Sequence, residues 1–77
     1  MPTFHFNIIS SQSTVIDVEG TTLMSLETAR HEAILDARAM MSTAILEGDD
    51  ISSNSIEICN DDGDVLLMVG FKEAINC

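Results

Sequence analysis

Residues Ser25 to Glu47, with the sequence SLETARHEAILDARAMMSTAILE, form the stretch of this chain that decides its fold. Apolar residues recur along it at steps of three and four, which is typical of one face of an α-helix. Ser25 is a good N-cap, because its hydroxyl can accept from the free amides of the first turn. Gly48 follows as a plausible stop. We therefore predict one amphipathic helix over about residues 25–47, with an inner face of small residues that permits close approach to a sheet: Ala29, Ala33, Ala37 and Ala44.

Two pairs of β-strand patterns flank this helix. Before it, residues 4–9 alternate with period two, and a β-branched run follows a polar break. After it, alternation returns at residues 56–59, and Asn60-Asp61-Asp62-Gly63 has the composition of a tight hairpin turn. We predict a single domain over residues 1–77, with strands at about 3–9, 14–18, 55–60 and 64–70.

The order of these elements predicts an α+β fold of two layers, ββαββ. A four-stranded, mainly antiparallel sheet would carry the one long helix packed on one face. The strand order stays open. An all-antiparallel sheet would run two, one, three, four, whereas the apolar fourth strand suits a central place or a covered second face. The tail from Phe71 can form a further turn of helix.

The charge of the chain excludes several classes of partner. Thirteen Asp and Glu stand against three Lys and Arg, giving a formal net charge of -10. Nucleic-acid binding needs clustered cations, and an anionic membrane surface would repel the chain, so we expect neither partner. We find no secretory signal and no apolar run near the roughly 20 residues that span a bilayer. A cytoplasmic protein with free thiols at Cys59 and Cys77 is therefore expected.

Four motifs together resemble a family of small uncharacterised bacterial proteins, classed as a domain of unknown function. They are F-x-F at 4–6, D-x-E-G-x-x-L at 17–23, A-R-x-E-A at 29–33 and I-x-I-x-N-x-x-G-x-V-L at 56–66. Gly70 stands where such proteins often carry proline, and Asn7 where an aspartate is common. The resemblance implies a small bacterial cytosolic domain and implies no activity.

Arg30 is the charged residue of most interest. At about 100° per residue it falls near the inner face of the helix, where an unpaired charge is costly. Asp17 and Glu19 are expected at the same end of the domain. We predict a structural ion pair of Arg30 with these acids, which would lock the second strand to the start of the helix. An anion site is the alternative.

The sequence offers no motif for catalysis, a cofactor or a metal. It has no G-x-S-x-G elbow and no Gly-rich phosphate loop. The acidic turn at 61–64 could form a rim for a hard cation, but it does not fit an EF-hand loop, and a solvated turn is favoured. We therefore predict no catalytic, cofactor-binding or metal site, and no enzyme. The soft metal ligands lack the spacing of a zinc site: His5, His31, Cys59 and Cys77.

Two apolar sets are predicted on opposite surfaces. Contiguous exposed patches often mark interfaces, and a symmetric dimer is the commonest oligomer. The first choice of interface is the sheet face away from the helix, with Leu66, Met68 and Ile9. The second is the back of the helix, with Leu35, Ala39 and Leu46.

These features predict a small acidic protein-interaction module of unknown biological role that self-associates as a homodimer. One alternative is an antitoxin-like or regulatory protein that binds a basic protein through charge complementarity. A second alternative, from another class, is an enzyme with sites between subunits.

Overall fold

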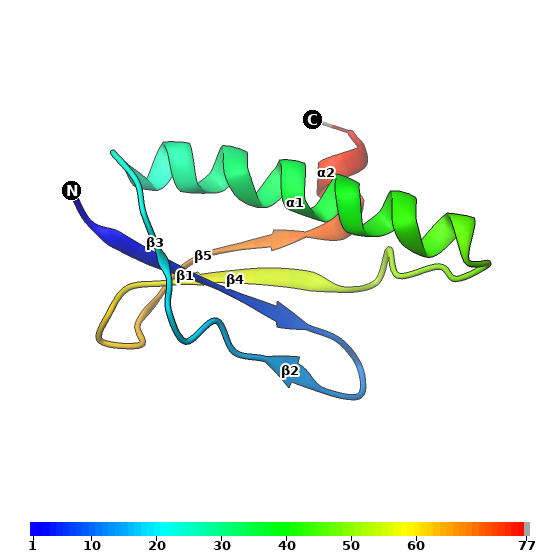
Figure 1. Cartoon of the computed structure of the whole chain (residues 1–77), viewed down its shortest axis with the longest axis horizontal. Helices are drawn as coiled ribbons and strands as arrows, with labels where there is room; N and C mark the ends of the chain where they lie inside the picture. The colour runs from blue at the N-terminus through cyan, green and yellow to red at the C-terminus, as the bar shows by residue number, and fades with distance from the viewer. Residues whose placement is uncertain (77) are drawn as a thin grey trace.

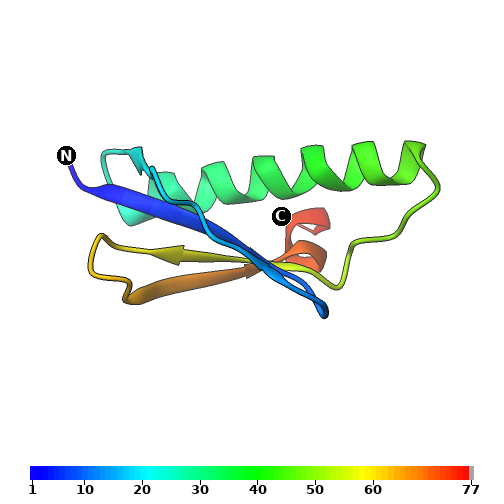
Figure 2. The same ribbon diagram turned by 60° about the horizontal axis from the view of Figure 1, so that its bottom comes forward.

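A helix of 21 residues, α1 (Leu26–Leu46), lies across one face of an antiparallel sheet in the computed structural model, which describes residues 1–76 (Figures 1 and 2). The predicted α+β architecture is thereby confirmed. Cys77, predicted to be a free thiol, lies outside the described residues. The other elements are β1 (Thr3–Ile9), β2 (Thr14–Val15), β3 (Thr21–Thr22), β4 (Ser55–Cys59), β5 (Val65–Gly70) and α2 (Phe71–Ile75).

The sheet runs β2-β1-β4-β5, with β3 also paired to β1, and every pairing is antiparallel. This is the all-antiparallel order considered from the sequence. A central place for the most apolar strand is therefore wrong, because β5 lies at the edge. Two short hairpin connections fix this outcome, since they pair β2 with β1 and β4 with β5. β1 and β4 then pair with each other at the centre of the sheet, and β2 and β5 lie at its edges.

The predicted second strand, at 14–18, is interrupted. β1 pairs with β2 at Ile8↔Val15 and with β3 at Phe4↔Thr21. Residues 16–20 on this side therefore face only residues 5–7 of β1, and the extra length bulges out of the sheet. The β-branched composition of 14–18 favoured a continuous strand, but the hydrogen bonds of Asp17 described below override it.

Both ends of α1 are closed by the residues expected from the sequence. The Ser25 hydroxyl accepts from the Thr28 amide at 3.2 Å. At the other end Gly48 has φ +86°, and the Asp49 amide donates to the Ala44 carbonyl at 2.8 Å. This is the Schellman arrangement, which leaves few helix carbonyls without a donor.

The core lies between α1 and one face of the sheet. The alanines of the helix, Ala29, Ala33 and Ala37, are fully buried, so the helix backbone approaches the strands closely. The bulk comes from the sheet and from α2, with these buried partners: Phe4, Ile56, Ile58, Val69 and Phe71. Because side chains alternate along a strand, the strand residues next to these buried ones point to the opposite face of the sheet, which we call the outer face.

The C-terminal end of α1 extends beyond the sheet (Figure 1). A helix of this length spans about 30 Å, whereas the strands of the sheet, at roughly 3.3 Å per residue, are shorter. Ile45, whose position in the helical repeat continues the apolar stripe, is therefore 68% exposed, and Leu46 is 86% exposed.

Candidate functional site

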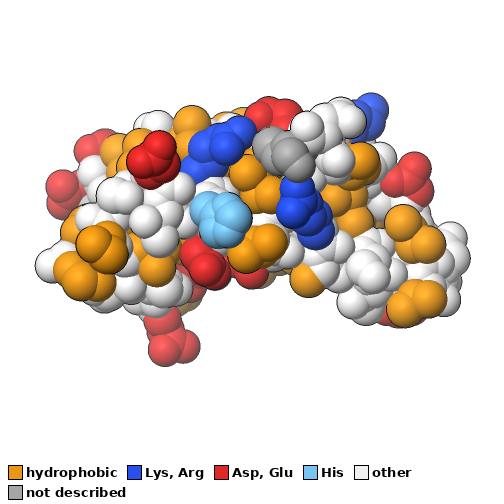
Figure 3. Space-filling model, turned by 90° about the horizontal axis from the view of Figure 1, so that it is seen from above, with side chains coloured by type: hydrophobic (Ala, Val, Ile, Leu, Met, Phe, Trp, Pro, Cys, Tyr) orange, Lys and Arg blue, Asp and Glu red, His pale blue; other side chains and the backbone are white. Residues whose placement is uncertain are grey.

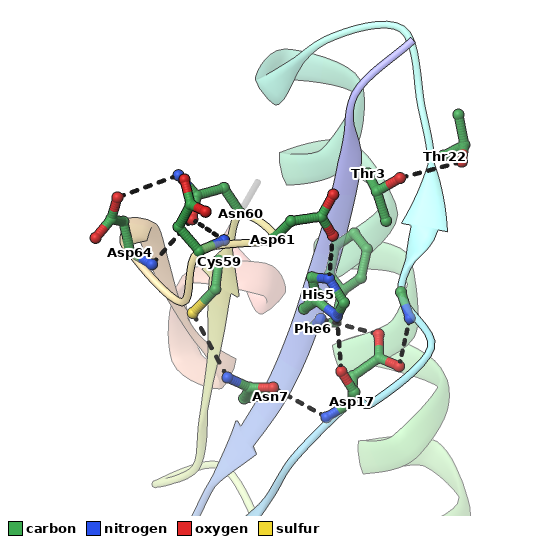
Figure 4. A network of polar contacts seen from close by, with 12 residues as sticks. Thr3, His5, Phe6, Asn7, Asp17, Thr22, Cys59, Asn60, Asp61 and Asp64 are labelled. Atoms are coloured by element: carbon green, nitrogen blue, oxygen red, sulfur yellow. Dashed lines mark hydrogen bonds and ion pairs between the residues drawn. The ribbon is translucent and has the colours of Figure 1, made fainter.

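A network of polar side chains covers part of the outer face (Figure 4). It is the main cluster of ionisable and hydrogen-bonding groups away from the core. It joins β1 to two segments that lie far away in the sequence, the bulge at 16–20 and the β4–β5 turn. We call it the outer-face network, and it comprises His5, Asn7, Asp17, Glu57, Cys59 and Asp61.

The side chain of Asp17 makes a hydrogen bond to β1 where the interrupted second strand does not pair with it. Its carboxylate accepts from the backbone amide of Phe6 at 3.1 Å and from that of Gly20 at 3.1 Å. Its own amide donates to the side-chain oxygen of Asn7 at 2.9 Å. Partial burial opposes ionisation of Asp17, but these amides and the charge of His5 outweigh it and lower its pKa. The amide of Phe6, which would be unsatisfied beside the bulge, is thus hydrogen-bonded.

Gly20 makes the bulge possible. Its φ of +76° lies in the left-handed region that favours glycine. A β-carbon there would lie 2.7 Å from Cγ2 of Thr3 and 2.9 Å from Cε1 of His5. The backbone of the bulge therefore packs directly against β1, which a larger residue would prevent.

His5 bridges the bulge and the β4–β5 turn. Nδ1 lies 2.8 Å from the carbonyl oxygen of Asp17, and Nε2 lies 2.8 Å from a carboxylate oxygen of Asp61. Both partners are acceptors, so both ring nitrogens donate only when the imidazole is protonated. The hydrogen bond to Asp61, followed by that to Asp17, raises the pKa of His5, although partial desolvation opposes the shift.

The inner part of the network surrounds the thiol of Cys59. Asn7, which is buried, donates to Glu57 Oε1 at 3.3 Å and to Cys59 Sγ at 3.5 Å. Cys59 donates in turn to Glu57 at 3.6 Å. Burial, then the negative charge of Glu57, raises the pKa of this thiol. Cys59 is a free cysteine that is only 3% exposed.

This arrangement favours a structural role over nucleophilic chemistry. A reactive cysteine needs a lowered pKa and access to solvent, and Cys59 has neither property. A general base needs a free nitrogen lone pair, whereas both nitrogens of His5 face acceptors. Within residues 1–76, no group of three or more His, Cys, Asp or Glu is placed to hold a metal ion. The outer-face network is thus suited to fastening three segments together.

The structure does not place Arg30 in the ion pair predicted with Asp17 or Glu19. Among residues 1–76, the ion pair between side chains is that of His5 with Asp61. Arg30 is exposed on α1. Asp17 lies with the outer-face residues His5 and Asn7, on the other side of the sheet from the helix. The lock that holds the second strand is therefore His5 with Asp17, and it fastens the strand to β1.

The six predicted interface residues lie in three places. Leu66 and Met68 are 40% and 49% exposed on β5. Ile9 is half-buried on β1, and Ser55 and Glu57 of β4 separate it from them, so the outer face is not one apolar patch. Leu35, Ala39 and Leu46 are exposed on the back of α1. Near the end of that helix, an open groove is lined by Arg38, Met41, Ser42, Ile45, Leu46 and Ile75.

Arg38 has a role that the sequence reasoning missed. Its Nε donates to the carbonyl oxygen of Ala74 at 2.8 Å, which satisfies a carbonyl in the last turn of α2 and ties that helix to α1. Lys and Arg side chains gather on the face that carries the helices (Figure 3). The only signal in the sequence is that Arg38 directly follows Ala37 of the buried stripe.

Raising the pH is expected to weaken the outer-face network. The pKa of His5 is raised above 6.5 in the folded chain, so the folded state binds this proton more tightly than the unfolded state. The contribution of His5 to stability is complete below pH 6.5 and is lost as the pH rises through the folded pKa. The melting temperature should therefore fall over this range, as thermal unfolding at constant ionic strength can measure.

The control is His5→Gln, which does not titrate. Its melting temperature should fall less steeply over the same range, because only the general increase in negative charge remains. Equal slopes for the two proteins would show that His5 is not held as a proton-dependent bridge.

Residues 3–72 match the model of a family described as a domain of unknown function, DUF6894. No curated protein and no solved structure matches the chain. None of the helices within residues 1–76 is long and apolar enough to cross a membrane. Since the match covers nearly all of the sequence, the chain belongs to the DUF6894 family, as its motifs indicated.

Proposed function

We propose that the chain is a small acidic protein-interaction module that associates with a second copy of itself. The observation that supports this most directly is the surface of β5. Val65–Gly70 contains no charged residue and lies at the edge of the sheet. Three of its large apolar side chains are well exposed, Val65 at 53%, Leu66 at 40% and Met68 at 49%.

Carboxylates lie before and after this apolar strand, and they would keep its surface soluble before a partner binds. Asp61, Asp62 and Asp64 are exposed in the turn before β5, and Glu73 is exposed just after it. An apolar centre with a polar rim is the usual anatomy of a protein interface. Apolar burial would provide the affinity, and the acidic rim would keep the free chain soluble.

The proposed role is binding without catalysis, in the cytoplasm. The support is the outer-face network, in which the thiol of Cys59 is buried with a raised pKa and both ring nitrogens of His5 face acceptors. The absence of a membrane-spanning helix among residues 1–76 is consistent with this location.

Sedimentation equilibrium at several protein concentrations tests self-association. We expect a dimer that persists or strengthens as salt increases, because the contact is apolar and two chains of charge -10 repel each other in dilute buffer. A single-chain mass at all concentrations would contradict the proposal.

A second candidate function is the capture of a basic protein. The formal net charge of -10, from thirteen Asp and Glu against three Lys and Arg, favours it. Binding of this kind would weaken steeply with salt, whereas the apolar dimer would not. Measuring the salt dependence of any complex therefore separates the two functions.

A further inference from the structure

We infer that loss of the proton on His5 releases the β4–β5 turn from β1, whereas the bulge at 16–20 stays fastened to it. The imidazole lies between the bulge and the turn (Figure 4), and each of its nitrogens contacts one of them. We call this pair of contacts the His5 clasp. The release is a motion within one folded chain, so it does not depend on self-association. The fall of stability with pH described above does not distinguish the two contacts.

A neutral imidazole has one N–H and cannot satisfy two acceptors. Nδ1 of His5 lies 2.8 Å from the carbonyl oxygen of Asp17, and Nε2 lies 2.8 Å from a carboxylate oxygen of Asp61. In the protonated ring both nitrogens donate. In the neutral ring one nitrogen presents a lone pair to an acceptor oxygen at this short distance, which is repulsive. One of the two contacts therefore opens, and the surroundings of each contact decide which one.

The contact with the bulge is fixed by the surrounding backbone. The Phe6 amide donates to the Asp17 carboxylate at 3.1 Å, and the Asp17 amide donates to Asn7 Oδ1 at 2.9 Å. Residue 17 is thus tied to β1 without the help of His5. The backbone at Gly20 also lies against the ring, because a β-carbon there would be 2.9 Å from His5 Cε1. The ring and the carbonyl of residue 17 are therefore held together, and Nδ1 keeps the proton.

The contact with the turn has no such support. The Asp61 side chain is 72% exposed, so water can solvate its carboxylate once it leaves the ring. The turn keeps its shape through Asn60, whose side-chain oxygen accepts from the amides of Asp62 and Asp64 at 3.0 and 2.9 Å. Within residues 1–76, the Asp61 side chain bonds to His5 alone, and no other side chain of the turn bonds to β1. The turn can therefore move away from β1 with its own structure intact.

Three titratable groups face His5 from the elements packed against it: Asp17 from the bulge, Asp61 from the turn and Cys59, its paired residue on β4. Partial burial opposes ionisation of Asp17, but the amides that donate to it lower its pKa overall, so it stays ionised. Burial raises the pKa of the Cys59 thiol, which stays protonated. The charged residues of α1 lie across the sheet (Figure 2). The pKa of His5 is raised above 6.5, chiefly by its hydrogen bond to Asp61, so the clasp opens above that pH.

The tautomer of neutral His5 tests which contact is kept. Nitrogen-15 NMR of the imidazole follows both ring nitrogens as the pH rises. The full chain is used with His31→Gln, so that one of its two histidines remains. We expect Nδ1 to keep its proton and Nε2 to lose it. A neutral form protonated at Nε2 would overturn the inference, because the contact with the bulge would then be the one that opens.

Nuclear Overhauser contacts of the same ring test the motion of the turn. The contact between the His5 ring protons and the Asp61 side chain should disappear as His5 loses its proton. The contact with the α-protons of Gly20 should persist, since the bulge backbone lies against the ring. Loss of both contacts, or of neither, would contradict a release confined to the turn.

Asp61→Asn is the decisive variant, because a carboxamide can bond either form of the imidazole. Its oxygen accepts from the protonated ring, and its NH₂ group donates to a neutral Nε2. The contact with the turn should then persist at every pH, and the midpoint of the His5 titration should fall toward 6.5. Asp62→Asn removes the same charge from an exposed neighbour and should leave the release unchanged. If the turn still separated from His5 with rising pH in Asp61→Asn, repulsion at Nε2 would not be its cause and the clasp would be refuted.

Discussion

Replacing Phe71 by alanine is expected to lower the free energy of unfolding by about 3–5 kcal/mol, the usual cost of removing a fully buried phenylalanine. Phe71 is fully buried and belongs to the core beneath α1. Its amide also donates to Asn54, so it fastens the start of α2 to the chain before β4. For a domain of 77 residues, total stability is only about 4–12 kcal/mol. Urea unfolding followed by circular dichroism should show the variant to be mostly or partly unfolded.

Ile75→Ala is the matched control for this prediction. Ile75 lies in the same short helix, but it is 62% exposed. Removing its side chain should change the free energy of unfolding by no more than about 0.5 kcal/mol. If Phe71→Ala costs as little as Ile75→Ala, α2 would not be an integral part of the core.

The helix and its ends were predictable because their signals are local. Ser25 caps the first turn and Gly48 closes the last, and each acts on residues within four positions of itself. The alanine stripe can also be recognised from the helix sequence alone, since burial follows the 3.6-residue period of the helix. What the sequence could not show is where the sheet ends beneath the helix. Ile45 therefore fits the apolar stripe but remains exposed.

The outer-face network was not predictable, because it depends on contacts across the chain. His5 meets Asp61, 56 residues away, only after β1 and β4 have paired. Asp17 and Asp61 come together through His5, which contacts both. Asp17 was wrongly paired with Arg30, since Arg30 was placed near the inner face of the helix, where an unpaired charge is costly. The alternation of His5 with Phe4 and Phe6 already placed it on the outer face.

Replacing Asp17 by alanine is expected to lower the free energy of unfolding by about 2–3 kcal/mol. The carboxylate satisfies the backbone amides of Phe6 and Gly20, and leaving a partly buried donor without an acceptor costs about 1–3 kcal/mol. If the bulge detached from β1, the carbonyl of residue 17 would also lose its hydrogen bond from His5. Urea unfolding at neutral pH measures the loss. Asp17→Asn keeps one acceptor oxygen and should cost less than alanine.

The control and the pH dependence make this prediction specific. Glu19→Ala removes an exposed acid two residues away, and it should change stability by no more than about 0.5 kcal/mol. The pKa of Asp17 lies below 3.8 in the folded chain, so its contribution is complete above that pH and is lost as the pH falls through the folded pKa. The difference between wild type and Asp17→Ala should therefore be largest near neutrality and shrink in acid. If it were independent of pH, the ionised carboxylate would not be what holds the bulge against β1.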